Sequence, residues 1–596
     1  MIGSILSELK PLPASYLKVA RRIEALESDD LIPVRLALAA TFTADLLPPY
    51  LIVEGAVRGL KIASHIAPFN QLEQSLLAAD SALHAFNPQV IAVAAELRDL
   101  APPLAQAFLA QSPEDVEALL SAAIGRLEAL IVGARATSAA PILVFNFAEP
   151  ARLEAGLADP ALVASQARAV EDANARLADL CQSQGGVHVF DYRRVVNELG
   201  TQRWYDRKLW YWSRTPFGTE GHMALARVMA RTIRAALQPP CKCLVVDLDN
   251  TLWGGIIGED RMNGIALGED YPGNVYKDFQ RALLSLKERG ILLAIASKNN
   301  LQDAEQVFLE HPDCILKLED FAAHQIHWND KAGSIRAIAQ ELNIGTDAIA
   351  FFDDNPVERD WVRQALPEVK VIEVPKDPLQ YLSALDESGV FDQLSISAED
   401  RHRAQLYQVQ REREALQANS ANLADFLSGL NMTARIGYLD TSTRQRVAQL
   451  INKTNQFNLT TRRYSEGDLD RMVRDGAIVL WMRLSDRFGD NGLIAVAIAV
   501  PEAADDWRID SFLMSCRVLG RQAETTLLAY LMSEIARRGG KRVIGEYLPS
   551  RKNGLVADFY ASQGFEKQGE DGQTWIAKAR EIPPPAGIAV EIGDAA

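Results

Sequence analysis

The stretch that decides the fold runs Leu244-Val245-Val246-Asp247-Leu248-Asp249-Asn250-Thr251-Leu252-Trp253-Gly254-Gly255. Its apolar first residues predict a short buried strand, and two carboxylates, Asp247 and Asp249, come directly after it. In open α/β sheets the carboxyl ends of the strands are where ligands bind. Just past a strand end both side chains can converge on one ligand, and Gly254-Gly255 allows a sharp turn or a close approach of the backbone. The stretch therefore predicts a ligand site at the edge of a parallel sheet.

Further polar residues follow along the chain in order. Ser297 comes directly after the apolar run Leu292–Ala296, Lys331 follows a polar turn, and Asp353-Asp354 follow a second apolar run. Together with the two aspartates they are the set that phosphoryl transfer needs: a carboxylate nucleophile, a second carboxylate that moves the proton, a hydroxyl and a cation for the phosphoryl oxygens, and carboxylates for Mg²⁺. The number of residues between successive groups is about what one helix-and-strand crossover needs, so a large cap domain does not fit between them.

Two motifs carry a family resemblance. The run D-L-D-N-T-L-W-G-G at 247–255 and the run F-F-D-D-N-P-V-E-R at 351–359 resemble signatures of the haloacid dehalogenase (HAD) superfamily and, within it, of the FkbH-like proteins. The resemblance implies that Asp247 is a nucleophile forming an aspartyl-phosphate and that Asp249 is the general acid and base. It also implies that Ser297 and Lys331 bind the phosphoryl group, and that Mg²⁺ is held by Asp353, Asp354, Asp247 and the backbone carbonyl of Asp249.

The expected fold class is α/β, in a chain of three domains. Residues 1–238 alternate strand-like runs such as Val90–Ala94 with amphipathic segments such as Val116–Val132, and the break Pro239-Pro240 ends them. Residues 239–376 repeat the pattern, and the resemblance implies that they form the Rossmann-like, capless HAD core. A helical connector is expected at 377–420, a mixed α+β domain at 421–580 and a loose tail at 581–596.

The C-terminal domain contains a candidate anion-binding turn. The strand Trp507–Ser515 runs into Cys516-Arg517-Val518-Leu519-Gly520-Arg521, after which a helix begins, so that backbone N–H groups face an anion. This resembles the acyl-CoA loop of GNAT acyltransferases, although Gln522 stands where that loop has a small residue. The candidate residues for binding an acyl group, coenzyme A or phosphopantetheine are Cys516, Arg517, Gly520 and Asn553. A helix start favours the thiolate of Cys516, and a small buried apolar role is the alternative.

The N-terminal domain is similar to SGNH hydrolases in the order of a few polar residues. Thr41 or Thr43 follows an apolar run, Asn146 follows another, and His222 precedes a terminal helix. A hydrolase of that kind would have a serine in place of the threonine and an aspartate in place of Thr219. We therefore expect a non-hydrolytic docking or lid domain.

Composition excludes some classes of function. Lys and Arg total 62 against 78 Asp and Glu, which gives a formal net charge of −16, the wrong sign for a protein that coats nucleic acid. No stretch has the roughly 20 clean apolar residues of a membrane span, and the N-terminus lacks the pattern of a secretory signal. Five cysteines form neither a disulfide framework nor a paired metal motif, so reduced thiols in the cytoplasm are expected.

The FkbH-like resemblance also implies an activity. It is the transfer of a glyceryl group from 1,3-bisphosphoglycerate to the phosphopantetheine thiol of an acyl carrier protein, with dephosphorylation and with Mg²⁺ as cofactor. A carrier is acidic, so docking needs a local basic patch, for which Arg462-Arg463 and Arg551-Lys552 are candidates. The alternative is a plain HAD phosphatase acting on a sugar, lipid-linked or metabolite phosphate in polysaccharide or secondary-metabolite biosynthesis. A third hypothesis, a scaffold without turnover, is disfavoured by the intact aspartates.

Overall fold

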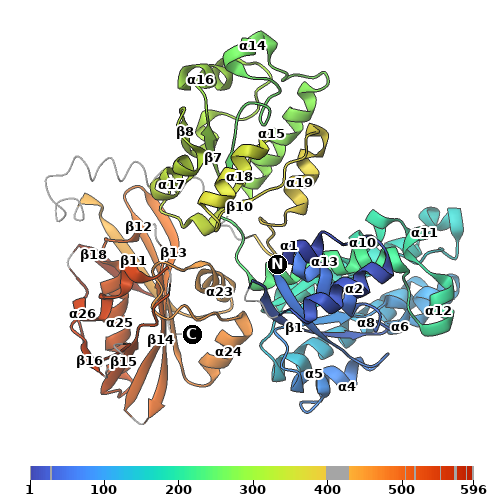
Figure 1. Cartoon of the computed structure of the whole chain (residues 1–596). Helices are drawn as coiled ribbons and strands as arrows, with labels where there is room; N and C mark the ends of the chain where they lie inside the picture. Colours follow the sequence, from blue (N-terminus) through green and yellow to red (C-terminus); the bar gives the residue numbers. More distant parts are fainter. Residues whose placement is uncertain are drawn as a thin grey trace. The chain divides into compact units, whose positions relative to one another are not determined.

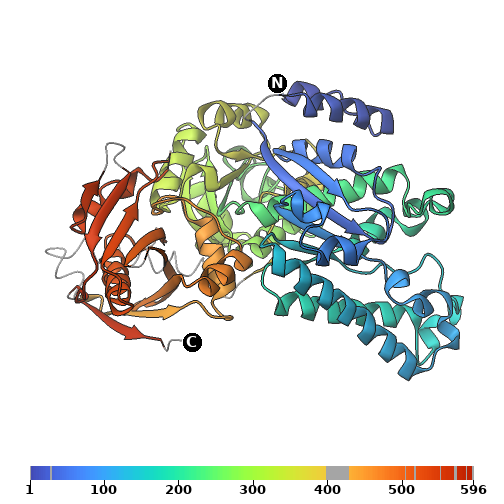
Figure 2. The same cartoon turned by 90° about the horizontal axis from the view of Figure 1, so that it is seen from below.

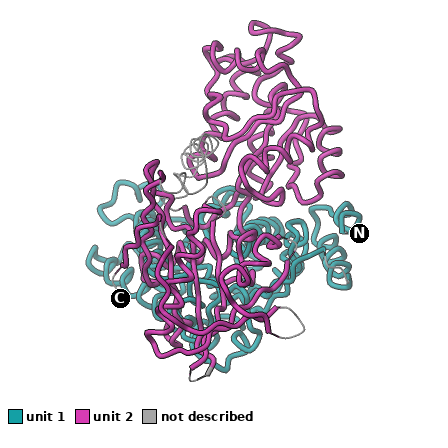
Figure 3. The backbone as a smooth tube through the Cα atoms, turned by 90° about the vertical axis from the view of Figure 1, so that its left-hand side faces the viewer, with its two compact units in different colours: residues 1–238, 464–471 teal, residues 239–463, 472–596 magenta. Residues whose placement is uncertain are grey.

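The computed structural model describes residues 2–26, 30–396, 429–503, 505–515, 518–550, 552–568, 573–585 and 587–593. The chain divides into two compact units, coloured separately in Figure 3. Unit 1 comprises Met1–Gln238 with Tyr464–Arg471, and unit 2 comprises Pro239–Arg463 with Met472–Ala596. Among the described residues, no helix is long and apolar enough to cross a membrane.

Unit 1 is built on a five-stranded sheet in the order β2-β1-β3-β4-β5, with all neighbours parallel. Figure 2 shows helices on both faces of this sheet, which explains why β3 is apolar and buried along its whole length. The strands are β1 (Ile32–Ala40), β2 (Leu60–Ile66), β3 (Val90–Ala94), β4 (Ile142–Phe145) and β5 (Val187–Phe190). The helices are α1 (Ile2–Leu6), α2 (Pro13–Glu24), α3 (Pro48–Val57), α4 (Leu72–Leu77), α5 (Ala82–Ala85), α6 (Leu97–Leu100), α7 (Pro102–Gln106), α8 (Pro113–Thr137), α9 (Gln166–Ser183), α10 (Tyr192–Leu199), α11 (Thr201–Trp204), α12 (Arg207–Ser213) and α13 (Thr219–Leu237).

Two local features of unit 1 follow from its sequence. Helix α8 begins with a capping box, in which the side chains of Ser112 and Asp115 each accept a backbone N–H of the other, with Pro113 in the first turn. The short segment Tyr464–Arg471 belongs to this unit although it comes late in the chain: the hydroxyl of Ser465 donates to the carbonyl of Ala139 at 2.6 Å.

The first part of unit 2 is a second five-stranded parallel sheet, in the order β10-β9-β6-β7-β8. Along β6, Leu244 and Val246 pack into the hydrophobic core on one face of the sheet, and Cys243 and Val245 into the core on the other. The strands are β6 (Cys243–Val246), β7 (Leu292–Ser297), β8 (Phe321–Ile326), β9 (Ile349–Phe352) and β10 (Lys370–Val371). The helices are α14 (Ile257–Gly264), α15 (Gly273–Glu288), α16 (Leu301–Glu310), α17 (Lys331–Glu341), α18 (Pro356–Ala365) and α19 (Tyr381–Glu387), all labelled in Figure 1.

The last part of unit 2 is an eight-stranded mixed sheet in the order β16-β17-β15-β14-β13-β12-β11-β18. Its pairs are antiparallel except β14 with β15 and β11 with β18, which are parallel. The strands are β11 (Met432–Tyr438), β12 (Ile478–Asp486), β13 (Gly489–Ala503), β14 (Asp506–Met514), β15 (Arg542–Glu546), β16 (Glu566–Gln568), β17 (Thr574–Lys578) and β18 (Ile588–Ile592). The helices are α23 (Arg444–Lys453), α25 (Ala523–Arg537) and α26 (Phe559–Ser562); α24 (Glu466–Arg474) begins in the late segment of unit 1 and ends in unit 2.

The expected fold class is confirmed: the chain is α/β, with two parallel sheets and one mixed sheet. Two boundaries differ from expectation. The expected connector at 377–420 begins inside a folded core, because Tyr381, Leu385 and Phe391 are buried against the second sheet; residues 397–420 of that connector lie outside the described residues. The expected loose tail at 581–596 contains β18, which pairs with β11 because its alternating apolar residues complete the edge of the mixed sheet.

Candidate active site

The candidate site lies at the carboxyl edge of the second sheet, beside its central strand β6. Asp247 directly follows β6 and Asp353 directly follows the neighbouring strand β9, and the N–H of Asp247 donates to the carbonyl of Phe352 at 3.1 Å. After β6 the chain forms β7, which lies next to β6 on one side. It later returns to form β9, which lies next to β6 on the other side. Such a reversal of strand order opens a crevice at the strand ends.

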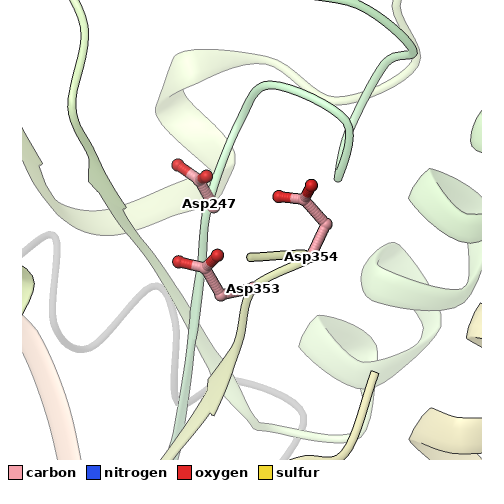
Figure 4. A group of neighbouring side chains, drawn as sticks. All are labelled: Asp247, Asp353 and Asp354. Atoms are coloured by element: carbon pink, nitrogen blue, oxygen red, sulfur yellow. The ribbon is translucent and has the colours of Figure 1, made fainter. Parts of the chain in front are cut away.

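Three carboxylates converge in this crevice, as Figure 4 shows. One oxygen from each of Asp247, Asp353 and Asp354 lies within 4.8 Å of the others. Asp353 is fully buried and Asp247 nearly so. Burial, followed by repulsion from Asp247, raises the pKa of Asp353 to about 7 and that of Asp354 to about 6. A cluster of hard oxygen ligands with this mutual repulsion fits a divalent cation such as Mg²⁺.

Lys331 joins the cluster from the start of α17. Its Nζ lies 2.8 Å from Oδ2 of Asp247 and 2.5 Å from Oδ2 of Asp353, and the side chain is buried. Burial alone would lower the pKa of Lys331, but attraction by the two carboxylates outweighs it and raises that pKa above its ordinary value. The other oxygen of Asp247, Oδ1, is buried and has no hydrogen-bond partner in the described part of the chain. Lys331 therefore holds one Asp247 oxygen and leaves the other available.

Asp249 is held apart from the three-carboxylate cluster. Its Oδ1 accepts hydrogen bonds from the Trp253 indole at 2.9 Å and from the N–H of Ile257 at 3.0 Å, and its Oδ2 accepts one from the Asn299 amide at 2.8 Å. Burial raises the pKa of Asp249 above its ordinary value. A positioned carboxyl group with a raised pKa suits proton transfer. Ser297 is the buried last residue of β7, the strand on the other side of β6.

Three supporting residues were not singled out from the sequence. Asn299 orients Asp249, as described above. Arg359 donates to the carbonyls of Asp353 at 2.7 Å and Asp354 at 2.9 Å, which fixes the loop after β9. The hydroxyl of Tyr381 donates to the carbonyl of Asn250 at 2.9 Å. Asn299 stands two residues after Ser297, and Arg359 ends the second motif, so their positions beside the predicted site residues could have indicated a supporting role. Nothing in the sequence indicated a role for Tyr381.

The C-terminal candidates are placed differently. Cys516 and Arg517 lie outside the described residues. Gly520 has φ +76 and stands three residues before α25. Asn553 is buried, and its amide donates to the carbonyls of Asn458 and Leu548, both at 2.9 Å. Both amide protons of Asn553 are therefore engaged within the protein.

Asn553 stabilises an inserted chain segment. Around Asn458, the N–H of Leu459 donates to Phe512 of β14, and the N–H of Leu548, just past β15, donates to Leu459. The backbone at 457–459 thus bridges the ends of β14 and β15, strands whose direct pairing stops at Ile509.

The predicted basic patch is largely engaged within the protein. Arg462 pairs with Asp510 and with Glu546, both at 2.8 Å. Arg463 donates to backbone carbonyls, among them that of Thr454 at 2.9 Å. Arg551 lies outside the described residues, and Lys552 is exposed.

The SGNH-like candidates of unit 1 have separate structural contacts. The hydroxyl of Thr41 accepts the N–H of Glu96 at 3.0 Å, and the amide of Asn146 donates to Asp191 at 2.7 Å. His222 is buried; its Nδ1 lies 2.8 Å from the carbonyl of Gly218, and its ring stacks on Tyr50 at 5.3 Å.

Comparison with solved structures gives a substantial likeness. It is the N-terminal part of protein BF1531 from Bacteroides fragilis, described as containing a phosphatase domain complexed with Mg, which is 26% identical over 64% of this chain and 99% of that one, with a TM-score of 0.56. The chain is similar to a phosphatase-domain protein.

The likenesses to acetyltransferases are slight. A GNAT-family acetyltransferase of Staphylococcus aureus Mu50 (9% identity, TM-score 0.21) and an aminoglycoside 6'-N-acetyltransferase of Enterococcus faecium (16% identity, TM-score 0.20) each match 25% of this chain, over 100% and 98% of their own length. At these TM-scores they support no conclusion. No protein-family model matches the chain, and no curated protein sequence matches it.

Proposed function

We propose that this protein is a Mg²⁺-dependent HAD-type phosphatase whose active site is the cluster of Asp247, Lys331, Asp353 and Asp354. The observation that carries the proposal is the convergence of three carboxylates and one buried lysine at the strand-order reversal. The likeness to a phosphatase-domain protein solved with Mg supports it. The substrate is a small phosphorylated molecule.

The residues divide the chemistry among themselves. Oδ1 of Asp247 has no hydrogen-bond partner among the described residues, so its lone pair attacks the phosphorus while the bond from phosphorus to the leaving oxygen breaks. Asp249 donates a proton to that oxygen and then takes one from the water that hydrolyses the aspartyl-phosphate. Lys331 and Ser297 bind the phosphoryl oxygens. Mg²⁺ held by Asp247, Asp353 and Asp354 would neutralise phosphate charge.

Phosphate release tests this proposal. The full chain should hydrolyse p-nitrophenyl phosphate with Mg²⁺, and EDTA should abolish the reaction. Asp247→Asn should lower kcat by more than about 1000-fold, because the amide has no nucleophilic oxygen. Asp45→Asn, a substitution of the same kind in unit 1, is the control. Equal rates in Asp247→Asn and the unsubstituted chain would contradict the proposal.

We propose further that the protein transfers an acyl group. This group is glyceryl, which is taken from 1,3-bisphosphoglycerate and transferred to the thiol of a phosphopantetheinylated acyl carrier protein. The support is the resemblance of the 247–255 and 351–359 motifs to FkbH-like proteins. Intact-protein mass spectrometry of the carrier, after incubation with the enzyme and Mg²⁺, tests it. A glyceryl-sized mass gain that disappears with Asp247→Asn is expected.

One observation favours the alternative, a plain phosphatase acting on a sugar or metabolite phosphate. In the C-terminal domain both amide protons of Asn553 are engaged by backbone carbonyls, so this candidate has no donor left for an acyl carrier arm. Phosphate release without any mass gain on the carrier would select the plain phosphatase.

A further inference from the structure

Unit 1 contains a cavity that the proposed function does not use. Its volume is about 670 Å³, within the range of small-molecule sites. Its walls include the residues just after β3, Ala95 to Arg98, and those just after β4, beginning at Asn146. The cavity therefore lies at the carboxyl ends of β3 and β4, and this edge of an open α/β sheet is where ligands bind.

The cavity is rich in guanidinium groups. Four arginines line it against two carboxylates, Glu96 and Asp206. Both carboxylates have partners inside the protein: Glu96 forms an ion pair with Arg98, and Asp206 caps α12 by accepting the N–H of Leu209 at 3.0 Å. Burial also raises the pKa of Glu96 to about 7, which weakens it as a fixed negative charge at neutral pH. The lining arginines besides Arg98 are Arg152, Arg207 and Arg214.

Arg98 is oriented before any ligand arrives. Its guanidinium carbon lies 3.6 Å from the centre of the Trp210 ring, which holds the group flat between α6 and α12. The two helices lie at the same end of unit 1 in Figure 1. Nε of Arg98 is buried and has no hydrogen-bond partner among the described residues. Stacking fixes the plane of a guanidinium, and the in-plane N–H donors that the ion pair with Glu96 does not use can meet an oxyanion.

Part of the remaining wall is aromatic. The rings that line the cavity include Phe147, Tyr192, Tyr205 and Tyr211, besides Trp210. Such rings offer apolar area to a ring or a short apolar body, while phenol groups supply polar contacts. An inorganic ion would leave this wall without contacts, so the lining fits a phosphate that carries an organic group.

We propose that the cavity of unit 1 binds an organic phosphate, with its phosphoryl oxygens on Arg98 and its organic group against the aromatic wall. A dianion matches the excess of arginines, and the guanidinium fork matches two phosphoryl oxygens. The site is separate from the carboxylate cluster of unit 2, so the proposal stands whether or not the protein is a phosphatase.

Calorimetric titration of the full chain in EDTA tests the proposal, with adenosine 5'-monophosphate, glucose 6-phosphate and inorganic phosphate as probes. We expect one organic phosphate to bind one site per chain, more tightly than inorganic phosphate. Arg98→Gln should weaken this binding at least about tenfold, because two charge-assisted hydrogen bonds are lost. Arg176→Gln, whose guanidinium pairs with Glu117 of α8 and does not line the cavity, and Asp353→Asn, in the cluster of unit 2, should leave it unchanged.

Two further measurements guard against a folding defect. The double substitution Glu96→Gln with Arg98→Gln removes both members of the ion pair, so no buried charge is left unpaired, and it should lose binding like the single variant. Hydrogen exchange of the unsubstituted chain should show protection at residues 95–98 and 205–214 when the ligand is present. The proposal is overturned if neither organic phosphate binds, if Arg98→Gln binds normally, or if protection falls outside these residues.

Discussion

At the scale of single residues, Lys331 is the side chain on which the candidate site depends most. It is the one cation that contacts both Asp247 and Asp353 among the described residues, and all three side chains are buried. Removing one member of a buried charged group leaves the others unpaired, which costs about 3–5 kcal/mol.

Lys331→Met should therefore destabilise the metal-free chain by about 3–5 kcal/mol and lower phosphatase kcat/KM by at least about 100-fold. Denaturant unfolding in EDTA and the phosphate-release assay measure the two effects. Lys298→Met is the matched control, because the Nζ of Lys298 pairs with Glu358 outside the carboxylate cluster. If the two variants lose equal activity, Lys331 has no special role.

Arg359 is a second single residue on which the site depends, although it does not touch the reacting groups. It contacts the carbonyls of Asp353 and Asp354 rather than their carboxylates. Residues that orient metal ligands typically affect metal affinity by about 10–100-fold. Arg359→Gln should weaken Mg²⁺ binding by that factor, measured by calorimetry, and raising Mg²⁺ should restore activity. A loss of activity that saturating Mg²⁺ leaves unchanged would contradict a positioning role.

At the scale of elements, β18 shows how pairing decides the state of a terminal segment. Five residues, Ile588–Ile592, pair in parallel with β11 and cover an edge that would otherwise expose unpaired backbone groups. Along this strand Ile588 is 7% exposed and Ile592 is 64% exposed.

The two isoleucines make a matched pair for a test. Ile588→Ala should lower the free energy of unfolding by about 2 kcal/mol, because it removes buried methyl groups from the core of the mixed sheet. Ile592→Ala should change it by less than about 0.5 kcal/mol. Denaturant unfolding of both variants gives the comparison, and equal small effects would mean that β18 adds little stability.

At the scale of the whole molecule, the carboxylate cluster links stability to pH and to Mg²⁺. The folded pKa values of about 7 for Asp353 and about 6 for Asp354 lie above the ordinary value of 3.8. At pH values between 3.8 and about 7, the metal-free folded chain therefore binds more protons than the unfolded chain. Its stability is greatest below about pH 4 from this source and falls as the pH rises through 6 to 7.

Thermal unfolding in EDTA should thus show this loss between about pH 4 and 7, and Asp353→Asn should make it smaller. Mg²⁺ should raise the Tm of the unsubstituted chain most at the upper end of the range, where the carboxylates are ionised and bind it best. A Tm in EDTA that does not fall across this range, or a Mg²⁺ effect independent of pH, would contradict the linkage.

The sequence was sufficient for several buried strands of the two parallel sheets. Continuous apolar runs bounded by polar turns mark strands that are buried on both faces, and the expected strands Val90–Ala94 and Ile349–Phe352 have the observed bounds. The supporting contact from Tyr381 could not be predicted, because it joins residues 131 positions apart. Likewise β18 could not be recognised as a strand without knowing that β11 had a free edge.

By itself, the sequence determined the α/β fold class and the order of polar residues after the strands, because both follow from local hydrophobic pattern and chain connectivity. Tertiary structure alone decided which side chains the carboxylate oxygens of the site contact. Lys331 contacts one oxygen of Asp247, and the other has no partner in the described part of the chain, while the nearby Asp249 faces Trp253 and Asn299 instead. The cavity of unit 1 arose the same way, since Arg98 and Trp210 become neighbours only when the sheet and α12 pack together. Such contacts depend on long-range packing, which no local pattern encodes.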